Sequence, residues 1–176
     1  SWREFINRNN GELLGVYGNL VNRTLVFVKK YYENKIPEGE IDTHIKVEIE
    51  LLYEKVGELI EKGDLKIAID EIFNFIRSIN KYFDEKTPWI TINTDKDECT
   101  NTIYTCLISI INIANLLHPF LPFSSVKVKN WLNHDVETWG YADLEIGTKI
   151  EDFDILFERL DKEIIAKELS NLGGNY

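Results

Sequence analysis

Hydrophobic residues recur every three to four positions along most of the chain, which is the period of an amphipathic α-helix. Capping residues, glycines and prolines divide this pattern into separate helices. A capping box of Ser1 and Glu4 is expected to open the first of them. The pattern predicts helices over 2–32, from 42 or 43 to 63, from 65 to just before Pro88, from 95 or 100 to 117, from 124 or 125 to 132, and over 161–172.

The predicted helix that ends at Leu117 is apolar on most of its faces, which is typical of the central, buried helix of a bundle. Residues 133–160 lose the helical period, so we expect irregular structure there, in which a short strand can form. The sequence therefore predicts a single all-α domain over 1–176, an antiparallel bundle of five to six helices. Its parts are a main bundle over 1–132, an irregular segment over 133–160 and a C-terminal helix over 161–172.

The composition supports a packed core and gives no sign of a membrane protein. Of the 176 residues, 44% are hydrophobic and 28% are charged, which suits one globular domain. No stretch approaches the roughly 20 consecutive apolar residues that a membrane-spanning helix needs. We therefore expect no membrane partner.

The charge is strongly acidic but unevenly placed. A net charge of −10 argues against general binding to nucleic acid, which depends on neutralising phosphates. Residues 1–36 nevertheless carry six basic and three acidic residues, and residues 72–89 carry three and two. The acidic excess lies in 37–71 and 133–176, each with four basic and eleven acidic residues.

Other features of the sequence concern its context in the cell. The chain begins with Ser1 rather than Met, and we expect it to be part of a longer protein. Cys99 and Cys106 lie seven positions apart, about 10.5 Å along a helix, which is too far for a disulfide. Few cysteines and no leader sequence favour a cytoplasmic protein.

Signals for catalysis are nearly absent. The chain has no glycine-rich phosphate loop, no nucleophile elbow and no zinc-protease motif. Its carboxylates follow the polar faces of the predicted helices, and its three histidines have no clear partners. We therefore expect neither a catalytic residue nor a metal or other cofactor within these residues.

The more specific signal combines two polar residues with an aromatic one. Asn19 and Arg23 are four positions apart and project from one face of a helix, where they can hydrogen-bond to the edge of an unstacked base. Trp89, preceded by Pro88, can supply a flat surface on which a base stacks. The structural alternative is a buried helix–helix hydrogen bond for Asn19, a salt bridge for Arg23 and a core position for Trp89.

Several stretches of sequence, in order, match one known family. They are Ser1–Phe5 with Asn9, Gly18–Leu25, Asn80–Trp89, Leu116–Phe123, and Leu144, Gly147 and Leu156–Leu160 near the end. With these motifs the chain resembles the C-terminal anticodon-binding domain of methionyl-tRNA synthetase, a class I aminoacyl-tRNA synthetase. The resemblance covers nearly the whole chain. Pro88-Trp89 together with Asn19 and Arg23 distinguishes the methionyl enzyme from the valyl and isoleucyl enzymes, which share the His118–Phe123 motif.

The resemblance implies a function and the residues for it. It assigns Trp89, held by Pro88, to stack on the first base of the CAU anticodon of tRNA(Met), and Asn19 and Arg23 to contact anticodon base edges. Some members carry a further Asn where this chain has Gly15, so any contact from that turn is lost or replaced. The alternatives are a protein-interaction module that kept the bundle but lost tRNA recognition, and the equivalent domain of a valyl or isoleucyl enzyme.

The resemblance also implies a parent enzyme, an ATP-dependent methionine–tRNA ligase that uses ATP and magnesium. Its catalytic Rossmann domain is expected before Ser1. Since Asn19, Arg23 and Trp89 come from the less acidic segments, we also predict a two-sided charge distribution, with the acidic segments turned away from Trp89.

Overall fold

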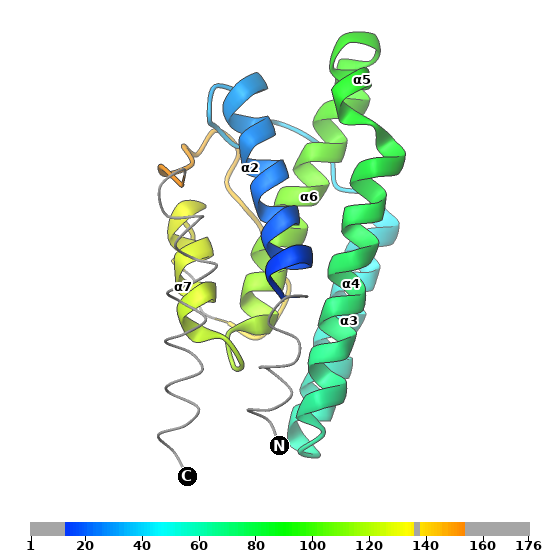
Figure 1. Ribbon diagram of the computed structural model, residues 1–176, viewed down its shortest axis with the longest axis vertical. Coiled ribbons are helices and arrows are strands. Elements are labelled where there is room, and N and C mark those ends of the chain that lie inside the picture. Colours follow the sequence, from blue (N-terminus) through cyan, green and yellow to red (C-terminus); the bar gives the residue numbers. More distant parts are fainter. Residues whose placement is uncertain (1–12, 136–137, 154–176) are drawn as a thin grey trace.

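The computed structural model describes residues 13–135 and 138–153 (Figure 1). The predicted capping box at Ser1 and the C-terminal helix over 161–172 lie outside the described residues. The elements in chain order are η1 (Leu13–Gly18), a π-helical turn, followed by α2 (Asn19–Tyr31), α3 (Thr43–Glu61), α4 (Leu65–Lys86), α5 (Pro88–Thr94), α6 (Lys96–Leu117) and α7 (Pro122–Trp131).

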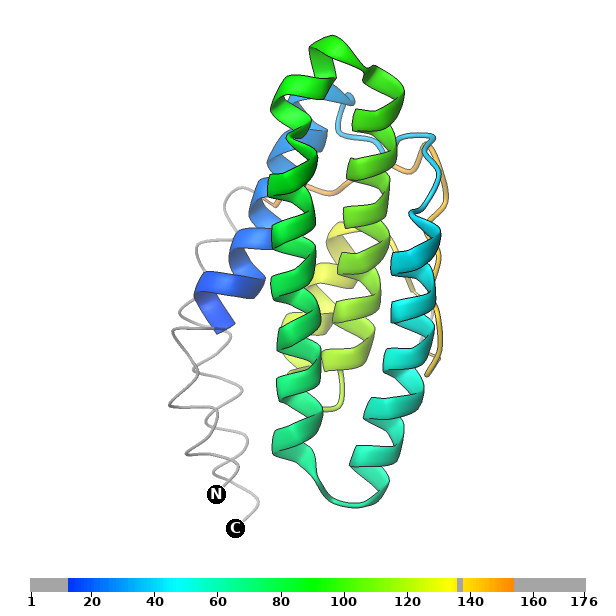
Figure 2. The ribbon, with the colours of Figure 1, turned by 90° about the vertical axis from the view of Figure 1, so that its right-hand side faces the viewer.

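The architecture is the predicted all-α bundle, and α6 lies at its centre. Every residue from Thr102 to Leu117 is buried, and α6 packs against α2, α3, α4, α5 and α7. By length and composition α6 could cross a membrane, which the sequence analysis did not anticipate, but 89% of its apolar stretch is buried by the other helices. Figure 2 shows α2 and α3 on opposite sides of α4 and α6.

Most helix ends follow the predicted signals. Asp42 caps α3 by accepting hydrogen bonds from the backbone N–H groups of His44 and Ile45, at 2.9 and 3.1 Å. Gly63 follows α3 with a φ of +79°, a conformation that favours glycine. The Asp95 side chain accepts from the Glu98 N–H at the start of α6, at 3.3 Å.

Two helix boundaries differ from the prediction. The predicted start of the α7 region at Ser124 or Ser125 is wrong, because Pro122 occupies its first position and both serines are buried within the helix. Proline suits that position because its ring presets φ and the missing N–H would have no helical partner. The sequence analysis also missed α5, which begins at Pro88 directly after α4 ends.

The irregular segment is attached to the bundle by buried amide side chains. Asn112 on α6 uses its whole amide group: Oδ1 accepts from the Ala142 N–H and the Tyr53 hydroxyl, both at 2.7 Å. Its Nδ2 donates to the Ala142 and Ile108 carbonyls, at 2.9 and 2.8 Å. One helical turn further, Asn115 Nδ2 donates to the Thr138 carbonyl at 2.6 Å. These bonds satisfy backbone groups that a buried loop would otherwise leave unpaired.

The segment then reaches the loop after α2. An isolated antiparallel β-bridge joins Lys35 and Lys149, in the region where a short strand could form. The Ile36 N–H donates to the Thr148 carbonyl at 2.9 Å, and the Ile150 N–H donates to the Asn34 carbonyl at 2.8 Å. The loop after α2 and the end of the described chain are thereby held together.

The two cysteines are free, as their spacing predicted, and both are buried. Burial raises the pKa of the Cys106 thiol to about 12, so the reactive thiolate is scarce at neutral pH.

We predict that Asn112→Ala lowers the free energy of unfolding by about 2–4 kcal/mol, because it leaves the Ala142 N–H and carbonyl without buried partners. Urea unfolding followed by circular dichroism measures this loss. Asn130→Ala, at an exposed position on α7, is the matched control. Equal stability of the two variants would contradict the role given to Asn112.

Candidate functional site

The junction between α4 and α5 places Trp89 on the surface. Thr87 adopts a left-handed conformation, with a φ of +46°, and ends α4. Pro88 is buried at the first position of α5, and its carbonyl accepts a weak hydrogen bond from the Cys99 thiol at 3.5 Å. The Trp89 side chain is 48% exposed. Pro88 therefore bears on the site by fixing where α5 begins, while Trp89 offers an open indole face.

Arg23 lies on α2 beside the end of α4. Its guanidinium carbon is 4.0 Å from the centre of the Phe83 ring, a cation–π contact. Its Nη2 donates to Asp84 Oδ1 at 2.6 Å. The Arg23 side chain is 23% exposed and that of Asp84 is 59% exposed, so this ion pair remains in contact with solvent.

Asn19 lies one helical turn before Arg23 and is exposed. Its Nδ2 donates to Asn80 Oδ1 at 3.4 Å. Asn80 in turn donates from its own Nδ2 to the Val16 carbonyl in η1, at 3.0 Å. Asn80 therefore links the π-helical turn to Asn19, and Asn19 and Arg23 each face one polar residue of α4.

Phe83 brings two of the predicted residues, Arg23 and Trp89, together, and Asn19 lies one helical turn from Arg23. Its ring centre lies 6.3 Å from that of Trp89, with the two planes inclined by 33°, while Arg23 covers the ring from α2. Arg23, Phe83, Trp89 and Asn19 are called the Phe83 cluster below. The structural alternative holds for the Arg23 salt bridge. The Asn19 hydrogen bond does join two helices, but it is exposed rather than buried. The alternative does not hold for Trp89, which lies outside the core.

The sequence analysis missed Phe83, Asn80 and Asp84 as parts of this arrangement. Asn80 and Asp84 are four residues apart, the same spacing as Asn19 and Arg23. Each bonded partner on α4 therefore lies 61 residues after its partner on α2. The matched spacing was visible in the sequence. The pairing was not, because it depends on α2 and α4 lying side by side in parallel.

The charges around the cluster are mixed. The acidic helix α3 lies across the bundle from α2 (Figure 2), but the Asp84 carboxylate is paired with Arg23 of the cluster. The described residues contain no group of three or more His, Cys, Asp or Glu side chains able to hold a metal ion. The predicted two-sided charge distribution stays a prediction.

Chemically, the Phe83 cluster can bind a flat, uncharged group with hydrogen-bonding edges. The Trp89 face can stack on a ring, Arg23 has further N–H donors besides the one held by Asp84, and Asn19 offers an amide. An unpaired nucleic-acid base has both properties. The fold and the cluster together define a helical domain whose surface suits an unpaired base.

Comparison with known proteins identifies the family to which this helical domain belongs. A family model described as the anticodon-binding domain of methionyl tRNA ligase matches residues 35–175. The chain is 61% identical over 173 residues to a methionine–tRNA ligase from Alkaliphilus oremlandii, covering 98% of this chain and 32% of that protein. It is 48% identical over 174 residues to one from Bacillus cereus, covering 99% and 32%.

The fold is also found in solved structures. The methionyl-tRNA synthetase of Mycobacterium tuberculosis in complex with methionyl-adenylate matches 84% of this chain and 31% of that chain, with a TM-score of 0.76 and 22% identity. The chain belongs to the family of anticodon-binding domains of methionyl-tRNA ligases. It spans about a third of the length of the curated relatives it matches. The resemblance seen in the sequence is confirmed, and the match selects the methionyl over the valyl and isoleucyl families.

We predict that the Arg23–Asp84 pair contributes at most about 1 kcal/mol to stability, because both side chains remain in contact with solvent. A double-mutant cycle with Arg23→Met and Asp84→Asn, followed by urea unfolding, measures the coupling energy, which should fall as salt is added. The exposed Lys55–Glu71 pair, at 3.0 Å, is the matched reference. A much larger coupling energy that does not change with salt would mean that the main role of Arg23 is to stabilise the fold.

Proposed function

We propose that the Phe83 cluster recognises the CAU anticodon of tRNA(Met), with Trp89 stacking on one base and Asn19 and Arg23 hydrogen-bonding to base edges. The observation that carries this proposal is the half-exposed Trp89, which adjoins Phe83 while Arg23 stacks on the same ring. The membership of the anticodon-binding family supports it.

Because Asp84 is paired with Arg23, we expect Arg23 to bind a base edge rather than a phosphate group. The Asp84 carboxylate offsets the positive charge of Arg23 and would repel a phosphate placed beside it. The guanidinium keeps a planar set of donors, which recognise a base edge by geometry. A net charge of −10 gives the chain no general attraction to RNA. Recognition of the anticodon then depends on a few directed hydrogen bonds to its bases.

The whole protein, in this proposal, is a methionine–tRNA ligase of the cytoplasm. A catalytic Rossmann domain before Ser1 would activate methionine with ATP and magnesium and transfer it to tRNA. Support comes from the relatives, which carry the name methionine–tRNA ligase and of which this chain covers 32%. The part played by the present residues is to hold the anticodon.

We predict that Trp89→Ala weakens binding of a CAU anticodon stem-loop by about fivefold to a hundredfold, the loss expected for one stacked base. Fluorescence anisotropy with a labelled stem-loop measures this. Trp139→Ala is the matched control, because Trp139 is 44% exposed but packs on Tyr53 of α3. Circular dichroism checks that both variants are folded.

A comparison of stem-loops with different anticodons distinguishes recognition of the bases from general contact with RNA. Stem-loops carrying isoleucine or valine anticodons should compete poorly with the CAU stem-loop for the unaltered chain. If Trp89→Ala leaves CAU binding unchanged, or reduces binding of all three stem-loops equally, base readout by Trp89 is wrong.

We predict that Arg23→Lys lowers discrimination between the CAU and the other stem-loops by roughly tenfold, because lysine keeps the charge but loses the planar fork. Competition binding measures the ratio of affinities. Lys30→Arg, at an exposed position of α2, is the control and should leave the ratio unchanged. Full discrimination in Arg23→Lys would show that the guanidinium does not contact a base edge.

A further inference from the structure

The side-chain amide of Asn80 on α4 is held in one orientation by the π-helical turn. Its Nδ2 donates to the Val16 carbonyl in η1 at 3.0 Å. A carbonyl oxygen only accepts hydrogen bonds, so the reversed amide would bring two oxygens face to face. Asn80 Oδ1 is therefore the atom that lies toward Asn19.

The orientation of the Asn19 amide follows from that of Asn80. Because Asn80 Oδ1 only accepts, Asn19 presents its Nδ2 to it, at 3.4 Å. Asn19 Oδ1 is then on the far side of the amide group. Within residues 13–135 and 138–153 no hydrogen bond occupies this oxygen, and Asn19 is exposed. The side chain thus offers an open hydrogen-bond acceptor to a ligand.

Arg23 offers donors beside this acceptor. It follows Asn19 by four residues, about 6 Å along α2, and Asp84 occupies one of its N–H groups at 2.6 Å. A neighbouring acceptor and donor match a base edge on which an amino group adjoins a ring nitrogen, as in cytosine and adenine. Uracil and guanine carry a carbonyl oxygen at the position of that amino group, and Asn19 Oδ1 would repel it.

From these contacts we infer that Asn80 is a positioning residue, which holds Asn19 Oδ1 outward so that it accepts a hydrogen bond from the exocyclic amino group of cytosine or adenine. The inference rests on the proposed function, since it requires an RNA base at the Phe83 cluster. It adds that Asn19 distinguishes amino from carbonyl groups on a base. It also adds that a residue outside the cluster sets this preference.

Removal of single amino groups from the RNA tests this role. The probes are the CAU anticodon stem-loop and two altered stem-loops, one with 2-pyrimidinone in place of cytosine and one with purine in place of adenine. We call the dissociation constant of an altered stem-loop divided by that of the CAU stem-loop the amino penalty. Fluorescence anisotropy measures both constants. A general weakening of RNA binding changes both constants and leaves the amino penalty unchanged.

The unaltered chain should show an amino penalty of about threefold to tenfold for one of the two altered stem-loops, the effect of one hydrogen bond. Asn19→Ala should bring this ratio close to one. Asn80→Ala should do the same although Asn19 is still present, because the Asn19 amide is then free to turn and present Nδ2. Asn80→Leu, which has a similar volume and no polar group, is a second variant with the same expected result.

A conservative variant separates positioning from a purely structural role. Asn80→Asp loses the donor to the Val16 carbonyl, but its carboxylate still only accepts from Asn19 Nδ2. This variant should therefore keep the amino penalty of the unaltered chain, even though its charge faces the Val16 carbonyl and weakens the contact with η1.

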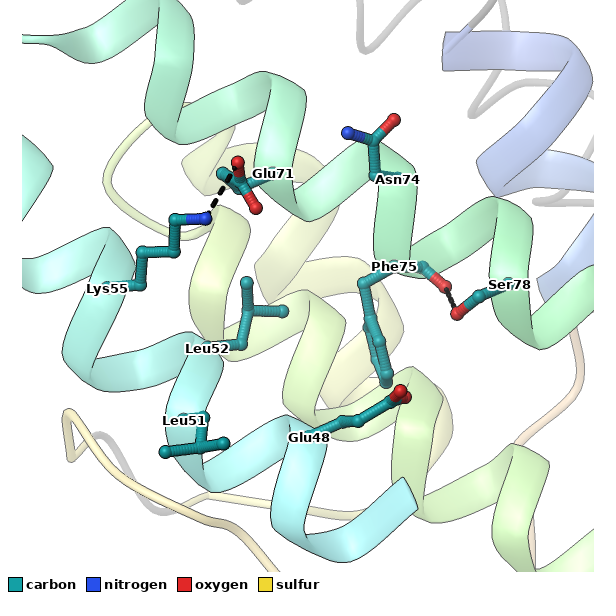
Figure 3. Close-up of a pocket in the computed structure, with 8 residues that line it drawn as sticks. All are labelled: Glu48, Leu51, Leu52, Lys55, Glu71, Asn74, Phe75 and Ser78. Atoms are coloured by element: carbon teal, nitrogen blue, oxygen red, sulfur yellow. Dashed lines mark hydrogen bonds and ion pairs between the residues drawn. The ribbon is translucent and has the colours of Figure 1, made fainter. Parts of the chain in front are cut away.

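Asn74→Ala is the matched control on the same helix. Asn74 lies at the hollow between α3 and α4 (Figure 3), and its Oδ1 accepts from Arg77 Nη1 at 2.8 Å. Six residues separate it from Asn80, so the two side chains leave α4 about 120° apart. Asn74→Ala should keep the full amino penalty. Circular dichroism checks that every variant is folded.

Several results would overturn the inference. An amino penalty that persists in Asn80→Ala and Asn80→Leu would show that Asn19 is oriented without Asn80. No amino penalty in the unaltered chain, or one that Asn19→Ala leaves intact, would show that Asn19 does not bind an amino group. Loss of the penalty in Asn80→Asp as well would mean that Asn80 only stabilises the fold.

These failures are distinguishable from failure of the proposed function. In each of them the CAU stem-loop can still bind selectively and depend on Trp89, which leaves the proposed function in place. If the unaltered chain does not prefer the CAU stem-loop to those with isoleucine or valine anticodons, both the proposed function and the role of Asn80 are wrong.

Discussion

The α6 helix has no polar side over most of its length, and the rest of the fold is arranged to cover it. Every residue from Thr102 to Leu117 is buried, so helices must pack on it from all directions. Burial of this much apolar surface is the main stabilising contribution in such a bundle. The polar groups that α6 does carry are then restricted to positions where they find partners, as Asn112 and Asn115 do with the segment over 138–142.

The Phe83 cluster follows from the way the helices around α6 end. α4 stops at Lys86 because Thr87 turns left-handed and Pro88 has no N–H to continue the helix. The chain restarts as α5 with Trp89 on its outer side. α2 lies alongside α4 in parallel, so two polar residues on each helix pair at matching heights. The side chains of the Phe83 cluster, which we propose contact a base, therefore all lie on helices.

The sequence predicted the features that depend on local pattern. The period of apolar residues placed the helices, and for two of their starts the cap is one of the two residues predicted, Asp42 and Asp95. α5 was missed because it is short and has little periodicity. The start of α7 was misplaced because the two serines resemble capping residues, whereas Pro122 begins the helix. Asn19, Arg23 and Trp89 stood out by residue type. The bridging position of Phe83 did not, because a core phenylalanine and one that supports a surface tryptophan look alike in sequence.

The β-bridge between Lys35 and Lys149 has a consequence for the order of folding. Contacts among helices that follow one another close short loops and can form early, whereas Asn34 Nδ2 reaches the Ile150 carbonyl across 116 residues. Closing so long a loop is entropically costly until α2, α6 and α7 have brought its ends together. We therefore expect the bridge to form late, after the rate-limiting step of folding. Loosening it would hasten unfolding while leaving the rate of folding nearly unchanged.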